Sequence, residues 1–315
     1  MKPFKTYDEQ IEILKTRNLI IDDENFAKEI LAKENYYNVI NGYKYLFLDN
    51  SSVDEKYINN CKFEEIYNLY IFDRNLRNII FKPILQIENE LRTQIAYVFS
   101  DNHKDNNYLC YDCFETLKPI GNDKVISDRA EKIYSLISKI QNDISKYVKY
   151  KSYINHYIIN YGYVPLWVLV NALPINRLSS FFNVMNQSER VQVSKHWNIK
   201  EKELQQYIVL LAYFRNLCAH DERIYCTKCN SKIQDTPYHS ALGIQKDNAN
   251  NYIYGKNDLF ALLIIFKILL DSKEFNNVVN KINGRIISLS KNLNTIKIDD
   301  VLSQMGFPDN WLNLK

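Results

Sequence analysis

Glycine and proline are scarce in this sequence, which contains 7 of each among its 315 residues. β-Sandwiches and β-barrels need many turn residues between short strands, so this scarcity argues against both folds. Long segments with helical periodicity lie between the few turn residues. The expected fold class is therefore all-α.

The sequence also lacks a long hydrophobic run. Its most apolar stretch, residues 259–266, is too short to span a bilayer and is followed by Lys267. The first five residues lead into an amphipathic segment and not into the apolar core of a signal peptide. We therefore expect a cytoplasmic protein with no membrane partner.

Neither sign of charge dominates, since 40 basic and 37 acidic residues leave a net charge of +3. No overall basic field indicates a nucleic-acid binder, so any RNA site has to be a local patch. The sequence contains no Gly-rich phosphate loop, no nucleophile elbow and no paired metal-binding carboxylates. Nucleotide-cofactor chemistry is therefore not expected.

Six cysteines in so long a chain do not indicate a disulfide framework. Four of them form two Cys-x-x-Cys pairs, which is the ligand count of a structural zinc site. These four are Cys110, Cys113, Cys226 and Cys229. His103 and His239 are nearby alternative ligands. Because intracellular thiols are more often unliganded, we expect no cofactor, with a structural zinc ion as the alternative.

Helical periodicity recurs along most of the chain. Helices are expected over residues 9–14, 25–31, 63–99, 133–161, 176–185 and 258–270, with a last pair at the C-terminus. Pro83 is expected to kink the third helix or divide it in two. Residues 226–255 form a long loop, which predicts a functional or poorly ordered segment. We expect a helical segment over 1–60 and a helical domain over 61–315 that contains this loop insertion.

The most informative motif has the sequence RNLCAH and occupies residues 215–220, near the end of a helix that Asn198 is expected to cap. Residues four apart share a helix face, so Asn216 and His220 point the same way. Arg215 lies about 140° round the helix and reaches back only through its long side chain. An imidazole, an amide and a guanidinium at one helix end suit a phosphodiester substrate, because they can move a proton, orient and hold the phosphate.

Two residues just beyond the motif extend this hypothesis. Arg223 can bind a second phosphate, and Tyr225 can stack on a base. The alternative interpretation is a helix-end histidine near a surface arginine with no function, since short motifs also arise by chance.

Two acid–arginine pairs lie upstream, each with the acid four residues before the arginine. They are Asp73 with Arg77 and Glu88 with Arg92. The simpler interpretation is a solvated helix face held by ion pairs. In the alternative, part of this face frames a substrate groove, and Arg74, Arg77 and Arg92 bind RNA.

With these motifs in place, the chain resembles the abortive-infection AbiD/AbiF family of bacterial phage-defence proteins over most of its length. Several short segments carry the resemblance through their order and spacing. They are KPFKT at 2–6, EQI at 9–11, NYY at 35–37, GY at 42–43, FDRNLR at 72–77, IENELRT at 87–93, PLW at 165–167, RNLCAH at 215–220 and RIY at 223–225. That family belongs to the HEPN superfamily, whose motif is similar to that of the nuclease modules of type VI CRISPR effectors.

The resemblance implies a HEPN-like helical bundle and metal-independent RNA cleavage that leaves a 2′,3′-cyclic phosphate and a 5′-hydroxyl. His220 would transfer the proton, Arg215 would stabilise charge on the phosphate, and Asn216 would orient one of them. One motif offers a single histidine, so a homodimer is expected to supply the second. The resemblance also suggests control of a toxic activity by a bound small noncoding RNA.

Two positions depart from the family pattern, which has an acid where Asn171 stands and a glycine where Asn176 stands. If that acid supports the catalytic group, activity is weakened here. The main alternative function is a non-catalytic RNA-binding protein in which Arg215, His220 and Arg223 only grip phosphates. A helical interaction protein with a structural zinc ion is a third hypothesis.

Overall fold

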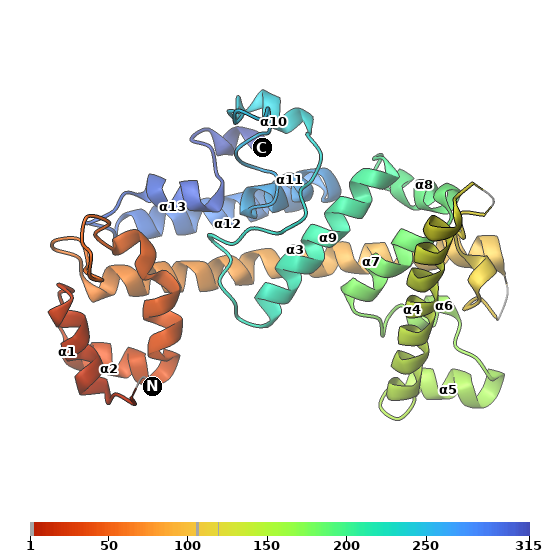
Figure 1. The fold of residues 1–315 in the computed structure, drawn as a ribbon, viewed down its shortest axis with the longest axis horizontal. Coiled ribbons are helices and arrows are strands. Elements are labelled where there is room, and N and C mark those ends of the chain that lie inside the picture. Colours follow the sequence, from red (N-terminus) through yellow and green to blue (C-terminus); the bar gives the residue numbers. More distant parts are fainter. Residues whose placement is uncertain (1–2, 105–106, 119) are drawn as a thin grey trace. The chain divides into compact units, whose positions relative to one another are not determined.

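The computed structural model describes residues 3–104, 107–118 and 120–315. Within these ranges every named element is helical, and β pairing is limited to isolated single-residue bridges (Figure 1). The all-α fold class expected from the sequence is confirmed. Lys2, which begins the first segment of the family resemblance, lies outside the described residues.

The chain divides into two compact units. The first unit comprises Met1–Lys82, Asn216–Cys229 and Asp235–Lys315, and the second comprises Pro83–Arg215 and Asn230–Gln234. This division differs from the boundary expected near residue 60, because the C-terminal helices group with the N-terminal ones. The division falls inside two helices, α3 (Phe63–His103) and α9 (Glu201–Ala219).

The first unit begins with two short helices that match the expected ones, α1 (Tyr7–Thr16) and α2 (Glu24–Glu34). Thr6 and Glu9 form a capping box at the start of α1, and Asp23 caps α2. A π-helical turn, η1 (Tyr37–Asn41), and a 3₁₀ turn, η2 (Lys44–Phe47), follow. The residues that follow η1, Gly42 and Tyr43, contact Arg223 and Tyr225, which lie just after the motif.

Helix α3 (Phe63–His103) is one continuous helix through Pro83, so the sequence is not divided into two helices there. In its first-unit part the buried stripe recurs at helical spacing. This stripe consists of Ile66, Leu69, Tyr70, Asp73, Leu76 and Ile80. Four of its six side chains are aliphatic, one is aromatic and one, that of Asp73, is a carboxylate.

The rest of the first unit is C-terminal. It contains α10 (Pro237–Ala241), α11 (Leu259–Leu269), α12 (Ser272–Ser290), α13 (Ile298–Met305) and η4 (Trp311–Leu314). Helix α11 is buried almost all round, as expected of the most apolar helix. The expected loop 226–255 contains α10 and, within the first unit, buries His239, Leu242 and Ile244, so part of it belongs to the core of this unit.

The second unit is built around one hydrophobic core. Its helices besides the end of α3 are α4 (Asp123–Tyr147), α5 (Ser152–Tyr161), α6 (Leu166–Leu169), α7 (Ile175–Val184), α8 (Gln187–Lys195) and the first part of α9 (Glu201–Ala219), with η3 at Tyr111–Cys113. Helices α4 and α5 replace the single helix expected over 133–161, and Gly162 ends α5 in the left-handed conformation. Ile95, Phe99, Phe181 and Ile208 are members of this core.

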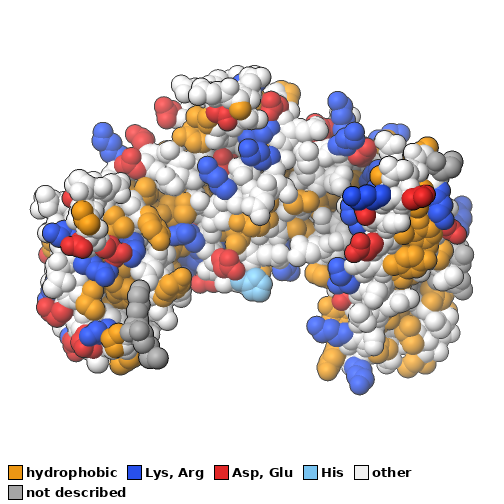
Figure 2. All heavy atoms as spheres, viewed as in Figure 1, with side chains coloured by type: hydrophobic (Ala, Val, Ile, Leu, Met, Phe, Trp, Pro, Cys, Tyr) orange, Lys and Arg blue, Asp and Glu red, His pale blue; other side chains and the backbone are white. Residues whose placement is uncertain are grey.

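Over the described residues, no helix is long and apolar enough to cross a membrane. On the face drawn in Figure 2, Lys and Arg side chains lie interspersed with Asp and Glu side chains. This mixture agrees with the nearly neutral composition.

Candidate functional site

The motif at residues 215–220 ends helix α9. The helix buries Leu204, Ile208 and Phe214 along one stripe, as its spacing predicts. The division between the two units falls after Arg215, so Arg215 belongs to the second unit and the rest of the motif to the first. His220 is exposed directly after the last helical residue, and its backbone N–H donates to the Asn216 carbonyl at 3.0 Å.

In the second unit, Arg215 faces a buried carboxylate. Its Nε lies 3.6 Å from Oε2 of Glu88, whose side chain is 1% exposed. Neither of these two atoms has a hydrogen-bond partner among the described residues. Arg92 also pairs with Glu88 and donates to the Leu173 carbonyl at 3.0 Å. Glu88 is therefore shared by two arginines and holds Arg215 only through a long ion pair.

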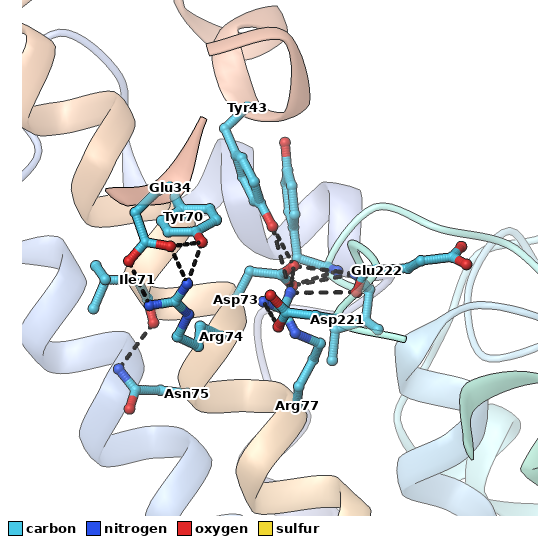
Figure 3. Close-up of polar contacts among 12 residues, drawn as sticks. Glu34, Tyr43, Tyr70, Ile71, Asp73, Arg74, Asn75, Arg77, Asp221 and Glu222 are labelled. Carbon is cyan, nitrogen blue, oxygen red and sulfur yellow. Dashed lines mark hydrogen bonds and ion pairs between the residues drawn. The ribbon is translucent and has the colours of Figure 1, made fainter. Parts of the chain in front are cut away.

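In the first unit, Asp73 is completely buried and accepts hydrogen bonds from three parts of the chain (Figure 3). The Tyr43 hydroxyl donates at 2.7 Å, Nη1 of Arg77 at 2.7 Å, and the backbone N–H groups of Ile224 and Tyr225 at 3.1 and 2.8 Å. Burial raises the pKa of Asp73, and the positive charge of Arg77 opposes this shift. We call Tyr43, Asp73 and Arg77 the Asp73 cluster.

The Asp73 cluster fixes the backbone just after His220. Nη2 of Arg77 pairs with Oδ1 of Asp221 at 2.7 Å, and Nη1 donates to the Glu222 carbonyl at 3.3 Å (Figure 3). Asp221 adopts a left-handed φ of 56°, which turns the chain away from the helix axis. The segment that follows the histidine is thus anchored to α3 at three consecutive peptide groups and one side chain.

The burial of Asp73 and Glu88 corrects the interpretation of these pairs as a solvated helix face. Asp73 is 0% exposed and Glu88 is 1% exposed. A solvated pair is worth little, whereas removing one partner of a buried pair is strongly destabilising. Both acids are therefore part of the framework that supports the motif.

Three of the arginines expected to bind RNA have partners within the protein. Arg77 is buried and pairs with Asp73, and Arg92 pairs with Glu88. Arg74 forms a two-pronged pair with Glu34 and lies over the Tyr70 ring, 4.7 Å from its centroid (Figure 3). We assign Arg77 a structural role. Of these three arginines, the partly exposed Arg74 and Arg92 remain candidates for RNA contact.

The two residues proposed beyond the motif differ in accessibility. Arg223 donates to the Gly42 carbonyl and is partly exposed, at the edge of a hollow that Tyr37 and Tyr45 also line. Tyr225 is buried and stacks on Tyr43, with ring centroids 5.7 Å apart. Because both faces of a buried ring are covered by protein, the base-stacking role expected for Tyr225 is corrected to a structural one.

Cys218 lies inside the motif but is not a plausible nucleophile. Burial raises the pKa of its thiol to about 12, so it is protonated at neutral pH. A thiol is a much weaker nucleophile than a thiolate. Cys218 is therefore not added to the residues expected to be catalytic, which stay Arg215, Asn216 and His220.

The two cysteine pairs considered for zinc lie in different units, Cys110 and Cys113 in the second and Cys226 and Cys229 in the first. The described residues contain no group of three or more His, Cys, Asp or Glu side chains arranged to hold a metal. The alternative ligands also have other partners. His103 contacts Glu189 at 2.6 Å, and the buried His239 bonds to Thr236 and to the Gly255 carbonyl.

Asn171 and Asn176, the two departures from the family pattern, are both exposed in the second unit. The Asn171 amide donates to the Trp167 carbonyl of its own helical turn at 3.1 Å. The Asn176 carbonyl accepts from the Ser180 hydroxyl at 3.0 Å. Asn171 thus has a local hydrogen bond and contacts neither Glu88 nor Arg92 by a hydrogen bond.

Residues 29–226, more than half of the chain, match the model of the Abi-like protein family. The chain belongs to this family. The match begins in α2, covers the Asp73 cluster and Glu88, and ends one residue after Tyr225. Membership of an abortive-infection family indicates a role in phage defence. No curated protein and no solved structure matches the chain.

The geometry of this Abi-like protein adds two residues to those singled out from the sequence. The buried Tyr43 and the exposed Asp221 complete the network around Asp73 and Arg77. A signal for Asp73 itself was present, because it occupies the apolar stripe of α3 between Leu69 and Leu76. A carboxylate at such a position is either buried with partners or destabilising.

Proposed function

We propose that this Abi-like protein is an endoribonuclease of abortive infection that cleaves RNA without a metal ion. The observation that carries the proposal is the arrangement at Arg215. Its Nε pairs with Glu88 only at 3.6 Å, and its side chain is 29% exposed. A charge-assisted hydrogen bond is strong at 2.7–2.9 Å, so this guanidinium retains binding capacity for a phosphate.

The proposed reaction needs only groups of the RNA and the motif. The ribose 2′-hydroxyl attacks the adjacent phosphorus while the bond from phosphorus to the 5′-oxygen of the next nucleotide breaks. A 2′,3′-cyclic phosphate and a 5′-hydroxyl result. One proton leaves the attacking hydroxyl and one reaches the leaving oxygen, so no water or oxidant is consumed.

Each motif residue has a role in this proposal. The exposed imidazole of His220 moves one of the two protons, because imidazole exchanges protons near neutral pH. Arg215 stabilises the negative charge that develops on the phosphate. Asn216 lies one helical turn before His220 and orients the imidazole or the phosphate.

A second proton-transfer group is supplied, in our proposal, by a second copy of the chain. Two copies related by a two-fold axis would bring two motifs together, giving one histidine as base and one as acid. Sedimentation of the active protein should therefore give twice the 37.4 kDa chain mass. RNA cleavage by a 37.4 kDa species would contradict the dimer.

The nuclease is tested by incubating labelled single-stranded RNA with wild type and with His220→Ala in the presence of EDTA. His156→Ala is a matched control, because His156 is also exposed and lies on α5 in the second unit. Wild type and the control should cleave, whereas His220→Ala should cleave about 100-fold or more slowly, as for loss of a general acid or base. Products should carry cyclic phosphate ends.

Three results would contradict this function. They are unchanged cleavage by His220→Ala, a requirement for Mg²⁺, and products with 3′-hydroxyl ends. RNA that is bound by wild type and His220→Ala but cut by neither would favour the non-catalytic RNA-binding protein.

We also propose that a bound noncoding RNA regulates the activity. RNA that copurifies with the protein should therefore be removed before the assay.

A further inference from the structure

A hollow of about 270 Å³ lies in the first unit beside the residues that follow His220. Its walls include Tyr37, Tyr45, Asp221 and Arg223, with Gly42 between the two exposed tyrosines. Tyr37 is 71% exposed and Tyr45 is 63% exposed. Exposed aromatic rings beside polar groups are the usual environment for an unstacked nucleobase.

The polar groups of the hollow are held in place by the protein. Asp221 is tied by one oxygen to the buried Arg77 at 2.7 Å, yet its side chain is 63% exposed. Arg223 donates to the Gly42 carbonyl, which fixes one side of its guanidinium at the wall. A carboxylate that only accepts hydrogen bonds therefore lies two residues from a guanidinium that only donates them.

The charges around the hollow favour a base over a phosphate as its occupant. Three arginines, Arg74, Arg77 and Arg223, are balanced by three carboxylates, which are those of Glu34, Asp73 and Asp221. Phosphate binding depends on an excess of positive charge, and this neighbourhood offers none. Hydrogen bonds to the edge of a base carry no such requirement.

We infer that this hollow binds a guanine base of single-stranded RNA, next to the phosphate that His220 acts on, an inference that rests on the proposed function. Guanine presents two adjacent donors, N1–H and the N2 amine, which match the Asp221 carboxylate. It also presents the acceptors O6 and N7, which match an arginine. On their Watson–Crick edges, adenine, cytosine and uracil each place an acceptor beside a donor, and a carboxylate repels that acceptor.

The test measures binding by wild-type protein of adenine-rich, 2′-O-methylated hexanucleotides, which lack the attacking hydroxyl and cannot be cut. One central position is guanosine, inosine or adenosine. The hexanucleotide with guanosine should bind about tenfold more tightly than the one with inosine, which lacks only the N2 amine, and this ratio is equivalent to about 1.4 kcal/mol. Equal binding of guanine and inosine would overturn the inference, and this comparison needs no variant.

Variants then assign the preference to residues. Asp221→Asn should reduce the preference for guanine over inosine to less than about threefold, while Asp299→Asn, an exposed aspartate on α13, should preserve it. Tyr45→Ala should weaken the binding of all three hexanucleotides alike, because stacking on an aromatic ring tolerates any base. A guanine preference that survives Asp221→Asn would overturn the role of Asp221.

Free guanosine monophosphate distinguishes a strand from a nucleotide as the ligand. It should bind at least tenfold more weakly than the hexanucleotide with a central guanosine, because a mononucleotide has no neighbouring bases to stack on the protein. Equal affinity would overturn the assignment to RNA. Guanine-selective binding without any cleavage of ordinary RNA would refute the proposed nuclease but leave this binding site in place.

Discussion

Asp73 and Glu88 begin from the same sequence pattern, an acid followed four residues later by an arginine, on the same helix α3. Both are buried, but their surroundings differ. Asp73 accepts hydrogen bonds from a tyrosine, an arginine and two backbone N–H groups. One oxygen of Glu88 has no hydrogen-bond partner among the described residues and faces Arg215 at 3.6 Å.

The difference indicates two roles for one pattern. A fully satisfied buried carboxylate specifies a unique local structure, and Asp73 does so for the segment after His220. A carboxylate with an unmade hydrogen bond holds its arginine less firmly, which in our proposal leaves Arg215 able to bind a phosphate. We therefore regard the Asp73 cluster as framework and Glu88 as the positioning residue for Arg215.

The largest effect is expected from Asp73→Ala. Removing this carboxylate takes away the only buried acid that pairs with Arg77, among the described residues, and leaves the Tyr43 hydroxyl and two backbone N–H groups without their acceptor, which together cost about 3–5 kcal/mol. Glu88→Ala should cost less, about 1–3 kcal/mol, because Arg92 keeps its bond to the Leu173 carbonyl. The free energies of unfolding in urea measure both. Equal losses of unfolding free energy in the two variants would contradict the distinction between Asp73 and Glu88.

A smaller effect, on activity instead of stability, is expected from Glu88→Gln. The substitution keeps the shape and removes the charge that orients Arg215, so kcat for RNA cleavage should fall at least about tenfold with little change in KM. Glu90→Gln, two residues along the same helix and partly exposed, is the control. An unchanged kcat for Glu88→Gln would show that Glu88 does not position Arg215.

The smallest effect is expected at Asp221, which pairs with Arg77 of the Asp73 cluster. The Asp221 side chain is 63% exposed, and an ion pair with a largely solvated partner contributes about 0.2–1 kcal/mol. Asp221→Asn should therefore lower the melting temperature only slightly. A loss as large as that of Asp73→Ala would show that the cluster extends to the surface.

Much of the fold follows from local patterns in the sequence. The apolar spacing of α3 and the almost entirely apolar composition of α11 predicted both helices, since such patterns can be read from neighbouring residues. The expected cap at Asn198 was wrong. Asn198 has a φ of 55°, α9 begins at Glu201, and the Glu203 carboxylate accepts from the Lys200 N–H instead.

The candidate site could be predicted only in part. The motif at 215–220 was visible because its residues are neighbours on one helix. The bond from Arg223 to Gly42 joins residues 181 apart, and the bond from Tyr225 to Asp73 joins residues 152 apart. No local pattern encodes such pairings, so the roles of Tyr43, Gly42 and Asp221 required the folded chain.

The central claim is that a ribose 2′-hydroxyl is the nucleophile at the site of Arg215 and His220. It is tested most directly with an RNA in which the nucleotide 5′ to a mapped cleavage position carries a single 2′-deoxyribose. Our account predicts that wild-type protein, in EDTA, cuts the all-ribose RNA at that position and leaves the substituted RNA intact there. Cleavage of the 2′-deoxy RNA at the same phosphate would contradict it.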